Sequence, residues 1–331
     1  MVKMRRATAE IIYNGESITV SLEDRTGGFT YNDPESGSSD DISLTINDRD
    51  NKWINGMFPR LGDKIQATIK VYDWQAPGDN RQLNCGSFVI DDPSFSGPPT
   101  QVQFKAVSKP ADSSFDTQQR TKTWENVTLQ QIATEIASRY ELVVQYSADE
   151  IKIDSLEQSD ETDSDFINKT CEKYNLSCKI YSNRLVIYDR EKQKQEPPVL
   201  TIKKGDMEQW SYNTTLEGVY TGGTMKYKDS DEGDDIEATY GDQTRSLAVN
   251  GKADSQADAE KQIKAEVNKA NEDKETMNVT IPGNPTLCAS QCVEISGLGV
   301  ADGKYFVKKV THSLGSKYTT KLDLAKVQAE V

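Results

Sequence analysis

The sequence has 331 residues, 39 of them basic and 53 acidic, so its formal net charge at pH 7 is -14. A chain of this length has room for two or three domains with real cores. The acidic excess opposes binding to DNA and to anionic membranes, so we expect no stable nucleic-acid partner.

The sequence gives no sign of export or of a membrane span. Lys3, Arg5 and Arg6 stand near the start, but no apolar stretch of a secretory signal follows them. No run approaches the roughly 18 apolar residues that a transmembrane helix needs. Five cysteines, an odd number, do not predict a disulfide framework. We therefore expect synthesis in the cytoplasm and no membrane partner.

The first hundred residues are predicted to be strands. From Ala7 to Ala106, apolar residues alternate with polar ones between Gly, Pro and Ser, and residues 32–41 form a polar loop. Large side chains stand in two of the connections, and as exposed tips they are a candidate partner interface. These residues are Trp53, Met57, Phe58 and Trp74. The alternative is that they pack back on their own β-domain.

After Lys109-Pro110 the apolar period changes to three and four residues, which predicts a helix. Thr128 with Gln131 reads as its capping box, and the helix runs to Tyr140. A second helix is predicted from Asp165 to Tyr174, with Ser164 as its cap. Short strands follow each helix, so the segment is predicted to be a small α+β unit.

The third segment begins after Pro197-Pro198 and returns to strands. An acidic run from Asp229 to Asp235 resembles a calcium loop only in charge, so we expect a solvated loop there. A helix is predicted from Ser255 to Asn271, and its thin apolar stripe fits a helix laid over the side of a barrel.

The order of strands and turns near the start of the chain recurs near its end, which suggests an internal duplication. The first copy has strands at 42–46, 64–69, 86–90 and 102–106, and the second has strands at 279–281, 291–295, 303–307 and 320–325. The predicted fold class is α+β, mainly β: two similar antiparallel β-barrel domains flank a small α+β domain. The predicted domains are 1–108, 109–198 and 199–331, the last with the helix near 255–271.

Catalytic and metal-binding chemistry is not expected. His312 is the only histidine, and its neighbour Ser313 lies on the opposite face of the predicted strand. A structural histidine is the better interpretation. Cys288 and Cys292 do not have the spacing of a zinc site, and no second histidine is available to complete one. We expect no enzyme activity, no catalytic or metal-binding residue and no cofactor.

The C-terminal strand set resembles a known family, the late-control D type baseplate hub proteins of contractile phage tails and related injection systems. The resemblance lies in Gly283-Asn284-Pro285, Asp302-Gly303-Lys304-Tyr305, Val310-Thr311-His312-Ser313 and Tyr318-Thr319-Thr320. The helix from Thr128 to Tyr140 and the helix start at 163–166 are also similar to the middle domain of the family.

The resemblance implies a homotrimer whose two barrels per chain form a pseudo-hexameric ring. Such a hub joins the six-fold tail tube to the three-fold spike, with tube, spike and other baseplate proteins as partners. It implies synthesis in the bacterial cytoplasm and incorporation into a phage tail or a tail-derived bacteriocin; the sequence leaves both open. Because the sequence ends at Val331, spike and lysozyme functions are expected on other chains. The alternative is a carbohydrate- or cell-wall-binding β-protein that uses exposed aromatic residues.

Overall fold

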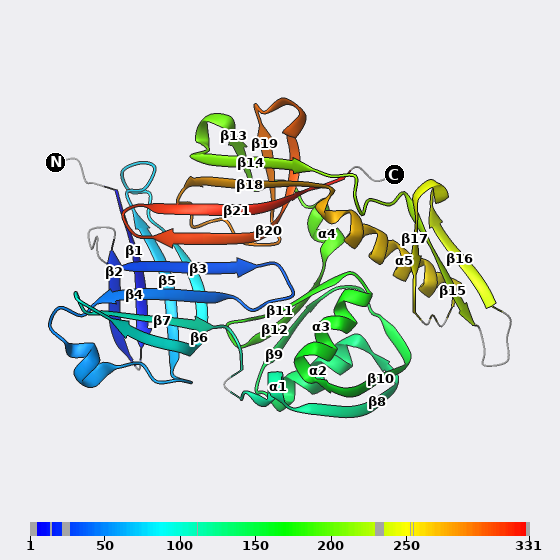
Figure 1. The fold of residues 1–331 in the computed structure, drawn as a ribbon, viewed down its shortest axis with the longest axis horizontal. Coiled ribbons are helices and arrows are strands. Elements are labelled where there is room, and N and C mark those ends of the chain that lie inside the picture. Colours follow the sequence, from blue (N-terminus) through cyan, green and yellow to red (C-terminus); the bar gives the residue numbers. More distant parts are fainter. Residues whose placement is uncertain are drawn as a thin grey trace.

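The chain folds into a mainly β structure with one large sheet, three small sheets and a few helices (Figure 1). The computed structural model describes residues 5–13, 15–21, 27–110, 112–228, 235–251, 253 and 255–328. Most of the acidic run that begins at Asp229 lies outside these described residues, so the predicted solvated loop is not tested there.

The first part of the chain is made of strands, as the alternating pattern predicts. In β5, for example, the inward positions Ile65, Ala67, Ile69 and Val71 are buried and the positions between them are not. The strands are β1 (Arg6–Tyr13), β2 (Glu16–Ser21), β3 (Gly28–Pro34), β4 (Asp41–Asn47), β5 (Lys64–Tyr72), β6 (Arg81–Ser96) and β7 (Gln101–Val107). A π-helix, Trp53–Met57, stands between β4 and β5.

The middle unit, from α1 to α4, has its own core, as predicted for an α+β domain. Thr128 and Gln131 form the predicted capping box of α2. The second predicted helix begins two residues earlier than expected: Thr162, not Ser164, accepts the hydrogen bond from the amide of Asp165 (3.1 Å). The elements are α1 (Ser114–Thr117), β8 (Gln119–Thr128), α2 (Leu129–Arg139), β9 (Val143–Ser147), β10 (Lys152–Thr162), α3 (Asp163–Lys173), β11 (Leu176–Tyr181), β12 (Arg184–Asp189) and α4 (Arg190–Gln195).

The last part of the chain holds a second strand set and a separate small sheet. The second set is β13 (Leu200–Lys203), β14 (Gln209–Thr214), β18 (Glu275–Pro282), β19 (Cys292–Ser296), β20 (Gly303–Leu314) and β21 (Tyr318–Lys326). The small sheet is β15 (Gly222–Lys228), β16 (Asp235–Gly241) and β17 (Ser246–Val249).

Helix α5 (Gln256–Asn271) is capped by Ser255, as predicted, but it does not lie over the side of a barrel. Ile263 and Val267 of α5 share a core with Met225 of β15 and Ala238 of β16, so the helix covers the small sheet (Figure 1). Gly223 makes this close packing possible, because a Cβ at that position would lie 2.7 Å from the Ile263 side chain.

The same four-strand order occurs in both halves of the large sheet. In the first half β4 pairs with β7, β7 with β6 and β6 with β5, all antiparallel. In the second half β18 pairs with β21, β21 with β20 and β20 with β19, again all antiparallel. The pairing agrees with the repeat that the sequence predicts. The outermost strands differ, because β1 is antiparallel to β5 whereas β13 is parallel to β19.

Two local features repeat with the strands. Gly86 in β6 and Gly303 in β20 both adopt positive φ, +106° and +133°. In β6 the ladder with β7 then shifts register just after Ile90, and in β20 the ladder with β21 shifts just after Val307. Each long strand therefore carries a β-bulge at the same distance from its glycine. Bulges at fixed positions are built-in features of a fold.

A hydrogen bond beside each bulge repeats as well. The carbonyl of Ile90 accepts from the amide of Gly62 at 2.9 Å, and the carbonyl of Val307 accepts from the amide of Ser290 at 2.9 Å. Both donors have positive φ, +86° and +69°. Matched backbone conformation and hydrogen bonding are stronger evidence for a repeat than strand order alone.

The two halves are joined edge to edge into one 13-stranded sheet. Before its bulge β20 pairs with β19, and after it residues 309–314 pair antiparallel with β3. We call this pairing of β3 with β20 the joint. Among the described residues the sheet runs from β14 to β2 without closing on itself, so the predicted pair of barrels appears as two halves of one open sheet (Figure 1).

Candidate functional site

The joint brings together residues that are far apart in the sequence. Tyr31 of β3 lies directly opposite His312 of β20, and their rings stack with centroids 6.1 Å apart and an interplanar angle of 8°. One pair along, the Thr311 hydroxyl donates to the Asn32 side-chain oxygen at 2.8 Å. Stacked rings and a paired polar contact fix the register of the two strands.

His312 is fully buried, and both of its ring nitrogens are hydrogen-bonded. The carbonyl of Leu287 can only accept, so Nε2 carries the proton and donates to it at 3.1 Å. Nδ1 accepts from the Tyr318 hydroxyl at 2.9 Å and lies 3.2 Å from the Thr320 hydroxyl. Burial lowers the pKa of His312 to about 4. The predicted structural role is confirmed.

Replacing His312 with Gln should change how stability depends on pH. The folded chain holds the imidazole neutral while the unfolded chain protonates it, so wild-type stability falls as the pH drops from about 6.5 to about 4. The shift of the His312 pKa corresponds to a loss on the order of 3 kcal/mol over this range. Urea unfolding at pH 7 and pH 4.5 should show the advantage of wild type over His312→Gln shrinking at the lower pH. An advantage that does not change with pH would contradict a neutral buried histidine.

Trp74, predicted as a partner contact, lies inside the chain with 5% of its surface exposed. Its indole N–H donates to the carbonyl of Gly283 at 2.6 Å, and its ring lies 5.5 Å from that of Tyr318. Gly283 is needed there, because a Cβ would overlap the Tyr318 ring. Trp74 therefore connects the first half of the chain to the second instead of facing a partner.

The other three predicted contacts divide between core and surface. Trp53 is buried against Tyr13 and Phe104, so the alternative of packing on its own domain describes it better. Met57 is partly buried against the same core. Phe58 packs edge-to-face on Phe95, with ring centroids 5.5 Å apart. Only Met57 and Phe58 retain exposed surface that a partner can reach.

Two exposed aromatic residues lie on strand edges, outside the connections that were predicted to be exposed tips. Phe95 near the end of β6 is 56% exposed, and Trp210 in β14 is 46% exposed. The Pro, Ser and Gly residues around Phe95 are typical of a turn, which hides the strand that carries it. Trp210 lies in a short polar strand.

A buried ionic cluster attaches the middle unit to the joint. Lys179 of β11 reaches Asp33 of β3 (2.5 Å), Asp40 (3.0 Å) and the carbonyl of Pro34 (3.1 Å). The other oxygen of Asp33 accepts from the amide of Ala289 at 2.8 Å. Asp33 thus links the first half, the second half and the middle unit.

The charges in this cluster depend on one another. Burial raises the pKa of Asp40 to about 7, although the Lys179 ammonium opposes the shift. Burial also opposes the charge on Lys179, but Asp33 and Asp40 outweigh it and raise the pKa of this lysine. The Tyr31 hydroxyl donates to Asp40 at 2.7 Å, so the cluster is continuous with the stacked rings of the joint.

A second ion pair fixes the same unit beside α5. Arg190 at the start of α4 bridges Glu35 (2.7 Å) and Glu272 (2.8 Å), and all three side chains are nearly buried. The Tyr188 hydroxyl donates to the carbonyl of Glu35 at 2.9 Å. Ion pairs and hydrogen bonds therefore hold the middle unit to residues of both halves of the chain, Glu35 in the first and Glu272 in the second.

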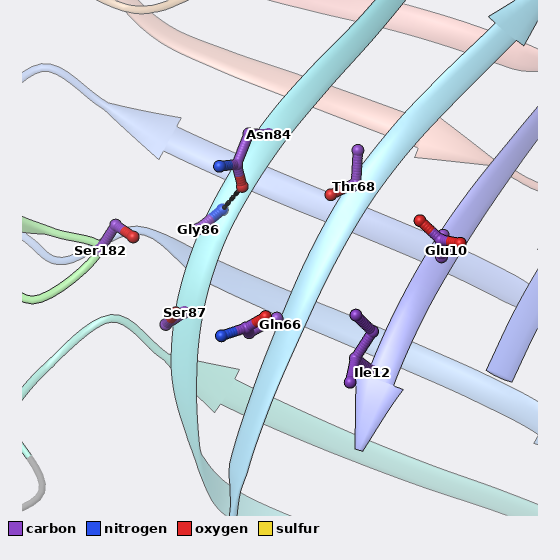
Figure 2. Close-up of a pocket in the computed structure, with 8 residues that line it drawn as sticks. All are labelled: Glu10, Ile12, Gln66, Thr68, Asn84, Gly86, Ser87 and Ser182. Carbon is purple, nitrogen blue, oxygen red and sulfur yellow. Dashed lines mark hydrogen bonds between the residues drawn. The ribbon is translucent and has the colours of Figure 1, made fainter. Parts of the chain in front are cut away.

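A shallow pocket lies where the tip of the β11–β12 hairpin meets β6. Its lining residues are Glu10, Ile12, Gln66, Thr68, Asn84, Gly86, Ser87 and Ser182 (Figure 2). The Asn84 side chain accepts from the amide of Gly86 at 3.0 Å, and Glu10 pairs with Lys70 at 2.6 Å. These contacts are those of an outer sheet surface, with no nucleophile and base placed together among the lining residues.

The described residues show neither a cluster of metal ligands nor a membrane-spanning helix. Within the described ranges, no three His, Cys, Asp or Glu side chains gather as metal ligands, and the five cysteines are free thiols. None of the helices in the described part of the chain is both long and apolar enough to cross a bilayer. The contacts that join the parts of the chain are strand pairing, buried hydrogen bonds and buried ion pairs.

The repeated strand set and the joint define a mainly β fold, and the similarity of the chain to known proteins gives its family. The chain belongs to the phage tail baseplate hub (GPD) family, whose model matches residues 96–318. This family is that of phage tail baseplate hubs, and its role is structural.

The chain is similar to a probable baseplate hub protein of Escherichia phage P2, with 25% identity over 226 residues, or 66% of this chain and 55% of that protein. The chain thus spans about half the length of this relative.

Solved structures share the fold at low sequence identity. A tail protein from Neisseria meningitidis MC58 has a TM-score of 0.75 at 15% identity, covering 97% of this chain and 96% of its own. A 43 kDa tail protein of prophage MuSo2 from Shewanella oneidensis has a TM-score of 0.72 at 12% identity, covering 97% and 98%. A component of the E. coli type VI secretion system has a TM-score of 0.58 at 12% identity, covering 92% and 73%.

Proposed function

We propose that three copies of this chain form a ring that joins the six-fold tail tube to the three-fold spike. Each copy contributes two similar tube-like β-domains, residues 1–108 and 199–331, and the α+β domain 109–198 lies between them. Tube, spike and other baseplate proteins are the partners. The particle is a phage tail or a tail-derived bacteriocin, into which the chain is incorporated after synthesis in the bacterial cytoplasm.

The repeat within the chain carries this proposal. Two sheets of the same strand order are already joined edge to edge, with β3 of one paired to β20 of the other. Three such chains would present six similar units around a ring, so a three-fold assembly can match a six-fold tube. The alternative of carbohydrate binding needed exposed aromatic residues, and two of the three aromatic residues predicted to be exposed, Trp53 and Trp74, are buried.

The mass of the purified chain in solution tests the ring. Native mass spectrometry, alone and after mixing with the hexameric tube protein of the same particle, should give three times the 36.9 kDa of the chain. Electron micrographs of the mixture should show one ring of this protein at an end of each tube. A chain that stays monomeric or dimeric in both conditions would contradict the proposal.

A further inference from the structure

The large sheet has several strand edges with no neighbour among the described residues, and two of them carry an exposed aromatic side chain. Strand β14 is the last strand on its side, pairing only with β18. The end of β6, residues 92–96, pairs with β7 on one side only. The ladder between β6 and its other neighbour, β5, ends where Lys64 of β5 lies opposite Val89 of β6. Unpaired edges with exposed apolar side chains are templates for pairing with another chain.

The repeat identifies what each free edge corresponds to. By strand order and bulge position, β6 is the counterpart of β20, and residues 92–97 correspond to residues 309–314. By their pairing with β4 and β18, β3 and β14 are counterparts, and residues 29–34 correspond to residues 210–215. The two free edges are therefore the counterparts of the two strands that pair in the joint.

We propose that β14 of one copy pairs antiparallel with the end of β6 of a second copy, in the register of the joint. This inference rests on the proposed ring and specifies its interface between subunits. A single arrangement would then occur at all six boundaries, once within each of the three chains and three times between chains.

Side chains at the corresponding positions fit this pairing. In the joint, Tyr31 lies opposite His312, and between copies Tyr212 would lie opposite Phe95. In the joint, Asn32 accepts from Thr311, and between copies Asn213 would lie opposite the hydroxyl of Ser94. An aromatic pair and an amide–hydroxyl pair thus occur in the same order on both edges.

The pattern of exposure also agrees with a missing neighbour. In β20 the alternate residues Val310, His312 and Leu314 are buried beneath the joint. At the counterpart of His312, Phe95 is 56% exposed, and Trp210, the counterpart of the buried Phe29, is 46% exposed. Pairing of the two edges would cover both aromatic side chains.

Pro93 limits the pairing at one point only. Pro93 would lie opposite Thr214, the pair that corresponds to Val310 and Asp33 in the joint. Because proline has no N–H, this pair can form at most one backbone hydrogen bond. Proline on an edge strand also discourages pairing in other registers. Because the two edges lie at different places on the chain, the contact is head-to-tail, and three copies close it into a ring.

Disulfide cross-linking tests the register. Ser96 and Ser211 correspond to Ser313 and Thr30, which are direct partners in the joint, so cysteines there fall within disulfide range. The matched control combines Ser94→Cys with Ser211→Cys, which are two residues out of register and about 7–8 Å apart across the ladder. Both variants carry Cys288→Ser, since Cys288 is the one native cysteine not fully buried.

After mild oxidation, non-reducing gels should show the monomer band of S96C/S211C lost to dimer and trimer, while the control stays mainly monomeric. A trimer by native mass with no cross-link, or with equal cross-linking in the control, would overturn the pairing and leave the ring intact. A monomer in every condition would overturn both. Cross-linked species larger than trimers would support the pairing and overturn closure at three.

Substitutions on the edges give an independent readout. Phe95→Lys and Trp210→Lys place charges on exposed positions, so we expect native folding by circular dichroism and loss of the trimer. Val143→Lys, also at an exposed apolar residue (62%), is the matched control and should leave the trimer unchanged. Trimers that persist with both edge variants would overturn the inference.

Discussion

Replacing Lys179 with Met should lower the free energy of unfolding by about 3–5 kcal/mol, the cost of breaking a buried ion pair. The side chain of Lys179 is 12% exposed, and those of Asp33 and Asp40 are 5% and 0% exposed. Without the ammonium, Asp33 and Asp40 remain buried next to each other with no compensating charge, so Asp40, whose pKa burial already raises to about 7, takes up a proton. Urea unfolding of the purified variant, followed by tryptophan fluorescence, measures the loss.

A surface lysine provides the control. Lys169 is 69% exposed and pairs with Glu161, so Lys169→Met should cost no more than about 1 kcal/mol. Adding Asp33→Asn and Asp40→Asn to Lys179→Met should recover part of the loss, because the uncompensated charges are gone. A Lys179→Met variant as stable as Lys169→Met would show that the cluster does not hold the middle unit in place.

Truncation of Trp74 to Ala should destabilise the chain by about 3–5 kcal/mol, as expected for a large buried aromatic residue. The substitution removes the packing against Tyr318 and leaves the carbonyl of Gly283 without its donor. Trp74→Phe keeps one aromatic ring and loses the N–H and part of the packing, so its cost should be smaller than that of Trp74→Ala, about 1–3 kcal/mol. Thermal and urea unfolding compare the two variants.

Phe58→Ala is the comparison that separates a core role from a partner role. Phe58 is only partly buried, on the outside of the first half, so its loss should leave the stability of the isolated chain nearly unchanged. If Trp74→Ala instead leaves stability unchanged and abolishes assembly, then Trp74 is a partner contact after all.

Local signals in the sequence predicted the local structure well. Alternation gave the strands, and Thr128 with Gln131 marked the start of α2, because both depend on residues close together in the chain. The cap of α3 was misplaced because Thr162 and Ser164 can each cap a helix and only the tertiary fold decides between them.

Long-range contacts were not predictable from the same patterns. Nothing in β3 or β20 alone says that they pair, since alternation describes the buried face of a strand and not its neighbour. The burial of Trp74 depends on Gly283, more than two hundred residues away in the chain. An aromatic residue in a hairpin tip looks exposed until the segment that covers it is known.

The opposite directions of β13 and β1 have a consequence for symmetry. The four-strand cores of the two halves match, but the outer strand runs antiparallel to its neighbour in one half and parallel in the other. In the proposed ring, the four-strand cores would then repeat every sixth of a turn, and β1 and β13 only every third. A tube that contacts the four-strand cores would meet six equal positions. A spike that contacts β1 or β13 would meet two alternating kinds of strand, and could bind to only one of them.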